Sequence, residues 1–198
     1  MAVELDTSLF YLQLSNVFSA KLCLPGLAAY FRVQSEEERI HAQILIDYLN
    51  HRDGLVRFLP LIPQPLTTTD PVQAFAMALN KERIVYSKLL QLHSAAVTIN
   101  DSHFLDFLQQ KLLTPQIKSI KDASDRLRML QRASKSELGL LTFDKQLGDL
   151  AVKEAKEMGS ILTGLANAPP NDGMFNTSIS SIFSVDFTAD NGPTPPVV

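Results

Sequence analysis

The sequence AYFRVQSEEERIHA at residues 29–42 carries the pattern that decides the fold. Its most informative residues, Glu38 and His41, are spaced i and i+3 and are therefore neighbours on one face of a helix. The same row continues through apolar positions at Phe31 and Leu45. Since the apolar row of a helix normally faces the core, we expect Glu38 and His41 to point inward.

Helical periodicity extends over most of the chain. Apolar residues recur at helical intervals in five stretches, at about residues 3–19, 27–51, 71–96, 103–131 and 147–165. Residues 55–69 hold three prolines, which do not suit an ordinary helix or a central strand, and Asp70 with Pro71 then forms a cap and a first turn. The sequence predicts an all-α fold, a four-helix bundle with a long crossover loop between helices two and three and a short fifth helix.

The length and composition fit one main domain. The 198 residues are 45% hydrophobic and 20% charged, which is the ordinary range for a globular chain. We expect residues 1–166 to form the bundle and its fifth helix. Residues 167–198, rich in Pro, Asn, Asp, Ser, Thr and Gly, are expected to form a disordered tail. The net charge of -3 gives no basic surface, so nucleic acid is not an expected partner.

The cysteine content and the N-terminal residues indicate an intracellular protein. Cys23 is the only cysteine, which excludes an intrachain disulfide and a thiolate zinc site and suits a reducing compartment. Glu4 and Asp6 precede any basic residue, unlike the start of a secretory signal. No apolar stretch is long enough to span a bilayer. We therefore expect a cytoplasmic protein without a membrane partner.

Further polar residues fall on helix faces that are expected to pack. Glu82 and Gln116 each lie between apolar residues at helical spacing, and Glu4 shares a face with Tyr11. Carboxylates gathered in a core are costly unless a cation neutralises them, and a pair of divalent cations does so. Carboxylate oxygens with one imidazole suit iron better than structural zinc. Taken alone, a Glu-x-x-His spacing usually marks a solvated helix face, so the hypothesis depends on all of these residues together.

Several segments resemble one known family. Residues 29–42 resemble the second helix of animal-type ferritins, and the sequence HRDG at residues 51–54 resembles the turn that follows it. The similarity covers about residues 3–150, and its other parts are residues 78–82, 89–93, 116–121 and 143–149. The resemblance implies a ferritin-like four-helix bundle of the heavy-chain-like, ferroxidase type.

The same resemblance implies a role in handling iron for eight residues. The expected ligands of two iron ions are Glu4, Glu38, His41 and Glu82, with Glu38 as the bridging carboxylate. Tyr11 and Gln116 are expected beside this dinuclear centre as polar partners. Glu37 matches a carboxylate that passes iron onward, and Asp106 matches an acidic position of the three-fold channel through which iron enters.

The implied function is iron storage with ferroxidase activity. Such a subunit oxidises Fe(II) to Fe(III) with dioxygen at the dinuclear site and deposits the product as a mineral core. The expected partners are iron ions, dioxygen and other copies of the chain, which together form a homo-oligomeric shell of twenty-four subunits.

Departures from the family pattern leave two alternatives. The chain starts three residues before Glu4, so we expect that end of the first helix to fray. The first alternative to the ferroxidase is therefore a structural or assembly-impaired subunit with weak or no ferroxidase activity. The second alternative, a di-iron oxygenase-like enzyme, is less favoured because the chain has only one Glu-x-x-His of the two that this bundle pattern uses. Pro115 lies within the fourth helix, where we expect either a kink or a restart capped by Thr114.

Overall fold

The computed structural model describes residues 1–166 except 59 and 67. The helices, in chain order, are α1 (Ala2–Ala20), α2 (Pro25–His51), α3 (Pro71–Thr98), α4 (Ser102–Leu108), the π-helical segment η1 (Gln109–Leu113), α5 (Thr114–Ala133) and α6 (Glu137–Ala166). No strand occurs in this described part of the chain. Residues Met1–Lys156 form one compact unit. The all-α prediction is confirmed.

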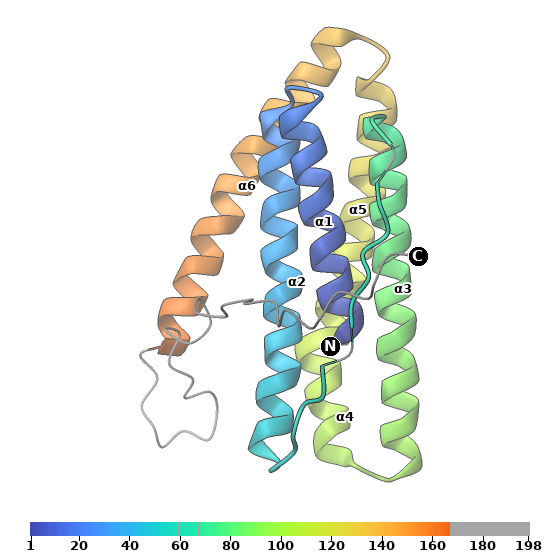
Figure 1. Cartoon of the computed structure of the whole chain (residues 1–198), viewed down its shortest axis with the longest axis vertical. Helices are drawn as coiled ribbons and strands as arrows, with labels where there is room; N and C mark the ends of the chain where they lie inside the picture. Colours follow the sequence, from blue (N-terminus) through green and yellow to red (C-terminus); the bar gives the residue numbers. More distant parts are fainter. Residues whose placement is uncertain (59, 67, 167–198) are drawn as a thin grey trace, which may run out of the picture. The chain divides into compact units, whose positions relative to one another are not determined.

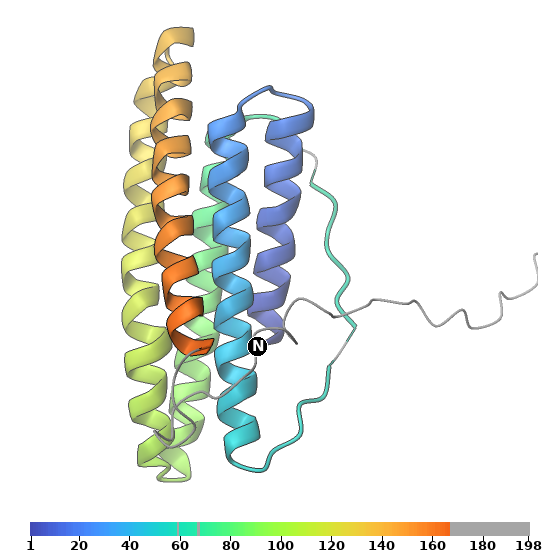
Figure 2. The same ribbon diagram turned by 90° about the vertical axis from the view of Figure 1, so that its left-hand side faces the viewer.

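The bundle is built from two helix pairs. Helix α1 packs along α2, and α3 packs along α5, as Figure 1 shows. Segments α4, η1 and α5 follow one another without a break and form the fourth helix of the bundle. Figure 2 shows the connection between α2 and α3 running from one end of the bundle to the other, so these two helices point in the same direction. This is the predicted crossover.

Local sequence signals set the helix starts. At the start of α3, the Asp70 side chain accepts a hydrogen bond from the Val72 backbone N–H at 2.9 Å, with Pro71 in the first turn. The predicted cap of this helix is confirmed. Asp101 caps α4 in the same way, accepting from the Phe104 N–H at 3.1 Å. These caps satisfy backbone donors that a helix start leaves without an intrahelical partner.

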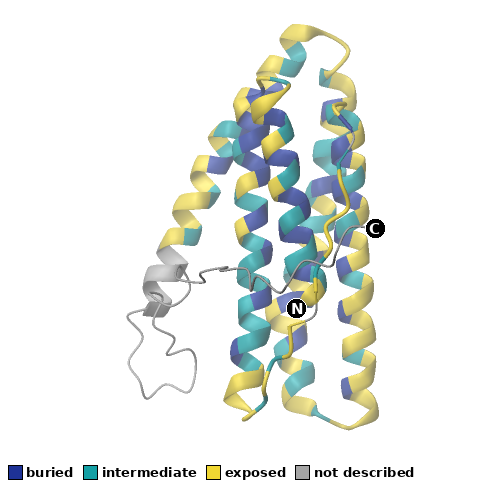
Figure 3. Cartoon of the chain, in the orientation of Figure 1, coloured by how far each residue is buried: buried dark blue, intermediate teal, exposed yellow. Residues whose placement is uncertain are grey.

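Two apolar clusters fill the interior of the bundle, and Figure 3 shows buried residues on the facing sides of the helices. The first cluster includes Leu14, Phe18, Leu27, Phe31, Ala78 and Leu130, and the second includes Val85, Leu89, Leu108, Leu112 and Leu113. In the sequence of α3, Glu82 falls between the two clusters, and on the fourth helix Gln116 does the same. A buried polar layer therefore separates two apolar layers.

The fifth helix is present, but it is longer than expected. Helix α6 begins at Glu137 and has 30 residues, so it starts well before residue 147. Its early turns are held by Phe143, Leu147 and Ala151, which recur at i, i+4 and i+8 and are buried in the first apolar cluster. Burial of this stripe extends the helix beyond what its local composition suggests.

We expected a kink or a restart capped by Thr114, but the backbone accommodates Pro115 after a π-helical turn. Immediately before it, η1 is π-helical, and the Thr114 N–H bonds to the Gln109 carbonyl five residues earlier. The start of α5 has no side-chain cap, so Thr114 does not serve as one. In a wider turn, the proline ring avoids the carbonyl of the preceding turn with which it would clash in a regular helix. The hydrogen bond that Pro115 cannot donate, because it has no backbone N–H, is also not required there.

Two further expectations concern the ends of the chain and membranes. The disordered tail expected at residues 167–198 lies outside the described residues. Among the helices of the described part, none is both long and apolar enough to cross a membrane.

Candidate metal centre

The buried polar layer draws one or more residues from each of four helices. Glu4 of α1, Glu38 of α2, Glu82 of α3 and Gln116 of α5 are each exposed by 4% or less. Tyr11 of α1 is buried among them, and His41 of α2 is half-buried. The layer thus contains six of the eight residues for which the sequence implied a role.

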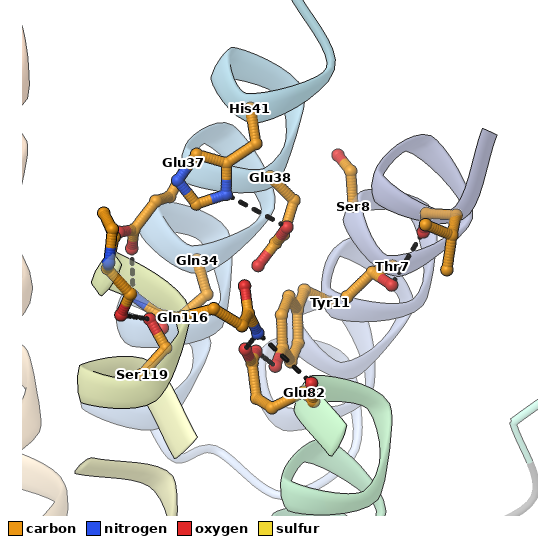
Figure 4. Close-up of polar contacts among 12 residues, drawn as sticks. Thr7, Ser8, Tyr11, Gln34, Glu37, Glu38, His41, Glu82, Gln116 and Ser119 are labelled. Carbon is orange, nitrogen blue, oxygen red and sulfur yellow. Dashed lines mark hydrogen bonds and ion pairs between the residues drawn. The ribbon is translucent and has the colours of Figure 1, made fainter. Parts of the chain in front are cut away.

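Glu82 is held by two hydrogen-bond donors. The Tyr11 hydroxyl donates to Glu82 Oε1, and Gln116 Nε2 donates to Glu82 Oε2 and, at 3.2 Å, to the Glu82 backbone carbonyl. Figure 4 shows the three side chains converging from α1, α3 and α5. Burial raises the pKa of Glu82, while the bonds from Tyr11 and Gln116 act in the opposite direction.

Glu4 lacks partners of this kind. Both of its carboxylate oxygens are buried without a basic, amide or hydroxyl donor among the described residues, and the side chain that bonds with Glu4 is another carboxyl, Glu38, which needs a proton on one of the two. Burial, and after it the charge of Glu38, raises the pKa of Glu4 to about 8. An unpaired buried carboxylate either keeps a proton or needs a cation, because desolvation of the charge costs several kcal/mol.

Glu38 is also a buried carboxyl group with a raised pKa, and His41 is its neighbour on the same helix. The Glu38 Oε2 atom lies 3.3 Å from His41 Nδ1. Burial raises the pKa of Glu38 well above its ordinary value, and the charges of Glu82 and Glu37 act in the same direction. Carboxyl groups that raise one another's pKa repel each other when they are ionised, and a bound cation would reduce that repulsion.

The donor chemistry fits iron, but the side-chain directions do not yet form a coordination shell. Within the described residues, no three His, Cys, Asp or Glu side chains are arranged to hold a metal ion. Figure 4 shows the carboxylate of Glu82 turned toward Tyr11 and Gln116. Each Glu82 oxygen accepts one of these two bonds and keeps a second lone pair, which remains available to a metal ion.

Two of the eight residues lie outside the buried layer. Glu37 is half-buried, and its Oε2 accepts from Gln34 Nε2 at 3.3 Å. Asp106 is exposed on α4 and accepts from Gln110 at 2.7 Å. An exposed position agrees with the surface role that the resemblance implied for Asp106, which stays a prediction.

Sequence reasoning missed the residues that set the distance between α1 and α2. The Ser8 hydroxyl donates to the Ser35 carbonyl at 2.7 Å, and the Ser35 hydroxyl donates to the Ser8 carbonyl at 2.9 Å. Ser8 lies one turn after Glu4, and Ser35 lies one turn before Glu38. The reciprocal pair therefore holds the two helices close where these carboxylates lie. Small residues one turn from each glutamate were the available signal.

Comparison with known proteins gives a consistent result. The family model described as ferritin-like domain matches residues 1–133. Ferritin-3, chloroplastic, of Arabidopsis thaliana is 36% identical over 151 residues, which cover 73% of this chain and 58% of that protein. Ferritin-2, chloroplastic, of Vigna unguiculata is 37% identical over 152 residues, which cover 73% of this chain and 60% of that protein. The chain thus spans about three fifths of the length of these relatives.

A solved structure has the same fold. It is an engineered closed form of the Archaeoglobus fulgidus ferritin, with a TM-score of 0.71 and 26% sequence identity. The similarity covers 74% of this chain and 88% of that one.

The relatives overturn one expectation. We expected a cytoplasmic protein, but these curated relatives are named as chloroplastic. The cysteine content suits any reducing compartment and so could not separate the cytoplasm from a plastid.

Proposed function

Because this chain belongs to the ferritin family, we propose that it stores iron and oxidises Fe(II) to Fe(III) at its buried carboxylate layer. The observation that supports this most is Glu4, whose two carboxylate oxygens are buried and interact with another acid, Glu38, rather than with a basic or amide donor. A protein gains nothing in stability from such a group, so the group points to a cation. Glu38, Glu82 and His41 supply further oxygen and nitrogen donors from the same layer.

The proposed reaction uses iron as its substrate. Two Fe(II) ions each give up one electron, and one dioxygen takes up these two electrons and two protons to form hydrogen peroxide. Ionised carboxylates favour the ion with the higher charge, so Glu4, Glu38 and Glu82 would stabilise Fe(III) relative to Fe(II). Tyr11 and Gln116 would orient the Glu82 carboxylate before iron binds. This is the heavy-chain-like role implied by the sequence.

The proposed assembly is a shell of identical subunits, twenty-four by resemblance. The crossover between α2 and α3 exposes Leu55 by 87%, Phe58 by 66% and Ile62 by 78%. Large apolar side chains exposed together normally mark a protein interface. Another copy of the chain is the proposed occupant. We further propose a plastid as the location, since the curated relatives are chloroplastic ferritins.

The test is aerobic addition of Fe(II) to the purified full chain, with ferric absorbance followed over time. The double variant Glu38→Ala and His41→Ala should lower the initial oxidation rate by about 10²-fold or more, as expected when a catalytic metal site is removed. Glu36→Ala is the matched control, because Glu36 is an exposed carboxylate on the same helix. Equal rates for wild type and the double variant would contradict ferroxidase activity.

The alternative reading predicts a different outcome of the same experiment. A structural subunit with weak or no activity would oxidise Fe(II) no faster than the double variant. Light scattering on the wild-type protein then tests the shell separately, since a monomer or dimer at micromolar concentration contradicts storage.

A further inference from the structure

An ion pair between α6 and Arg126 of α5, followed by three hydrogen bonds from Arg126 to α2, leads to the edge of the buried layer. We propose that Arg126 is a positioning residue for the centre, which holds the Glu37 carboxylate in place through Tyr30 and Gln34. The ligand that Glu37 would attract is a divalent cation on its way to the centre. This inference rests on the proposed function.

Three hydrogen bonds make up the connection from Arg126 to Glu37. Arg126 Nη1 donates to the Tyr30 hydroxyl at 3.2 Å, and the Tyr30 hydroxyl donates to Gln34 Oε1 at 3.2 Å. Gln34 Nε2 then donates to Glu37 Oε2 at 3.3 Å. Tyr30 and Gln34 are one helical turn apart on α2, and Glu37 lies on the next turn. The sequence of contacts ends at the residue that precedes Glu38.

Arg126 and Glu37 fix the direction of these hydrogen bonds from the two ends, because a guanidinium can only donate and an ionised carboxylate can only accept. The Tyr30 oxygen must therefore accept from Arg126. Tyr30 has a single hydroxyl proton and gives it to Gln34, whose carbonyl oxygen is therefore turned toward Tyr30. The amide nitrogen of Gln34 must then face Glu37. Without the guanidinium, the Tyr30 hydroxyl loses the donor that holds it in place, so Gln34 and the Glu37 carboxylate beyond it are held less firmly.

Acidic residues on two helices hold Arg126 in place. Arg126 Nη2 lies 3.5 Å from Glu154 Oε1 of α6 and 3.9 Å from Asp122 Oδ2 of α5. The guanidinium also lies over the Tyr30 ring, with its carbon 5.0 Å from the ring centroid. The Arg126 side chain is only 16% exposed, so these pairs are screened less than surface pairs. Burial raises the pKa of Tyr30, which keeps its hydroxyl protonated as a donor.

Glu37 is close enough to act on the centre electrostatically. Its charge contributes to the raised pKa of Glu38 and of Glu82. Because Glu37 is half-buried and Glu38 is buried, a cation arriving on this side would meet Glu37 first. A Glu37 carboxylate that is free to turn away attracts that cation less. Loss of its position should therefore weaken cation binding more than it slows the oxidation step.

The test compares Arg126→Met with Arg128→Met in the full chain. Arg128 is on the same helix, but its side chain is 69% exposed and its ion pair with Asp125 is long, at 3.7 Å. We expect Arg126→Met to raise the apparent KM for Fe(II) by about fivefold to tenfold and to change kcat less than about twofold, the pattern for lost ground-state binding. Titration with Co²⁺, followed by its visible absorption, should show the same loss of affinity without any turnover. Arg126→Lys, which keeps the positive charge, should recover part of the lost Co²⁺ affinity.

A double-mutant cycle separates positioning from a general effect on the fold. In a Glu37→Gln background, Arg126→Met should have little further effect on KM or on Co²⁺ affinity. An undiminished effect in that background would overturn the proposal, and so would equal KM values for Arg126→Met and Arg128→Met. Where Arg126→Met fails to fold, Tyr30→Phe tests the same link, because it removes the hydroxyl and keeps the ring. The proposed function is tested separately. If the Arg126 variants behave as the controls do, but Fe(II) oxidation still requires Glu38 and His41, then only the role of Arg126 is overturned.

Discussion

The Asp144 carboxylate of α6 accepts a hydrogen bond from the Leu27 backbone N–H at 2.8 Å, 117 residues away in the sequence. Its second oxygen accepts from the Gly26 N–H at 3.1 Å. Helix α2 begins after Leu24, which provides no side-chain cap. Asp144 therefore caps α2 from another helix, and the negative charge also suits the positive end of the α2 dipole.

Replacement of Asp144 by Ala should destabilise the subunit by about 2 kcal/mol, because two buried donors lose a charged acceptor. The midpoint of urea unfolding, followed by circular dichroism, measures the change. Asp149→Ala is the matched control, since Asp149 is exposed on the same helix. Equal midpoints for the two variants would contradict a capping role.

Gly26→Ala should be more damaging than its small size suggests. A Cβ atom at Gly26 would lie 1.8 Å from the Asp144 backbone oxygen, which cannot rotate away as a flexible side chain could. The helices would have to separate, at a cost of about 1–3 kcal/mol or more. Thermal unfolding should show a lower midpoint than for Gly159→Ala, since a Cβ at Gly159 has no atom within 4 Å. A Gly26→Ala protein as stable as wild type would mean that α6 is not packed this closely.

Without metal, the protein should lose stability as pH rises from about 5 to about 8. The folded pKa of Glu4 is raised from 4.5 to about 8, so in this window the unfolded chain is ionised and the folded chain retains a proton. The folded state then binds more protons, and the free energy of unfolding falls by at most about 1.4 kcal/mol per pH unit from this group. Glu4→Gln should flatten the profile measured by urea unfolding with a chelator present.

The control for this pH dependence is Glu36→Gln, which changes an exposed carboxyl on α2. Its pH profile should be parallel to that of wild type. Parallel profiles for Glu4→Gln and wild type would show that Glu4 does not stay protonated in the folded protein.

Tyr11→Phe should lower the stability of the metal-free protein by about 1–2 kcal/mol, because Glu82 loses a buried donor. The bond from Tyr11 lowers the pKa of Glu82, so the variant should also move this pKa further upward. Chemical unfolding at pH 7 measures the first effect. Tyr86→Phe, on α3 with a partly exposed side chain, should unfold as wild type does. A Tyr11→Phe protein that matches this control would mean that the bond contributes nothing.

Much of the fold could be predicted because its signals are local. The cap at Asp70, the prolines of the crossover and the apolar rows of α2 and α3 depend only on residues within a few turns of one another. The inward placement expected for Glu38 and Glu82 followed from the same rows, and both are buried. Their roles toward iron depend on the family resemblance and on the experiments above.

The contacts that escaped prediction connect residues far apart in the sequence. Asp144 was visible only as part of a motif, because its partners at Gly26 and Leu27 belong to another helix. The pairing of Arg126 with Glu154 likewise depends on where α6 packs, and no spacing in the sequence reports that. A stripe at Phe143, Leu147 and Ala151 was the one local sign that this helix begins early.

The π-helical segment η1 sets which way the two halves of the fourth helix face. In a regular helix, one added residue turns everything beyond it by about 100°, so insertions near one end would rotate the whole of the far end. The wide turn of η1 takes up about one such extra residue between α4 and α5. Without η1, the helix that carries Asp106 would present a face rotated by about 100° whenever Gln116 kept its bond to Glu82.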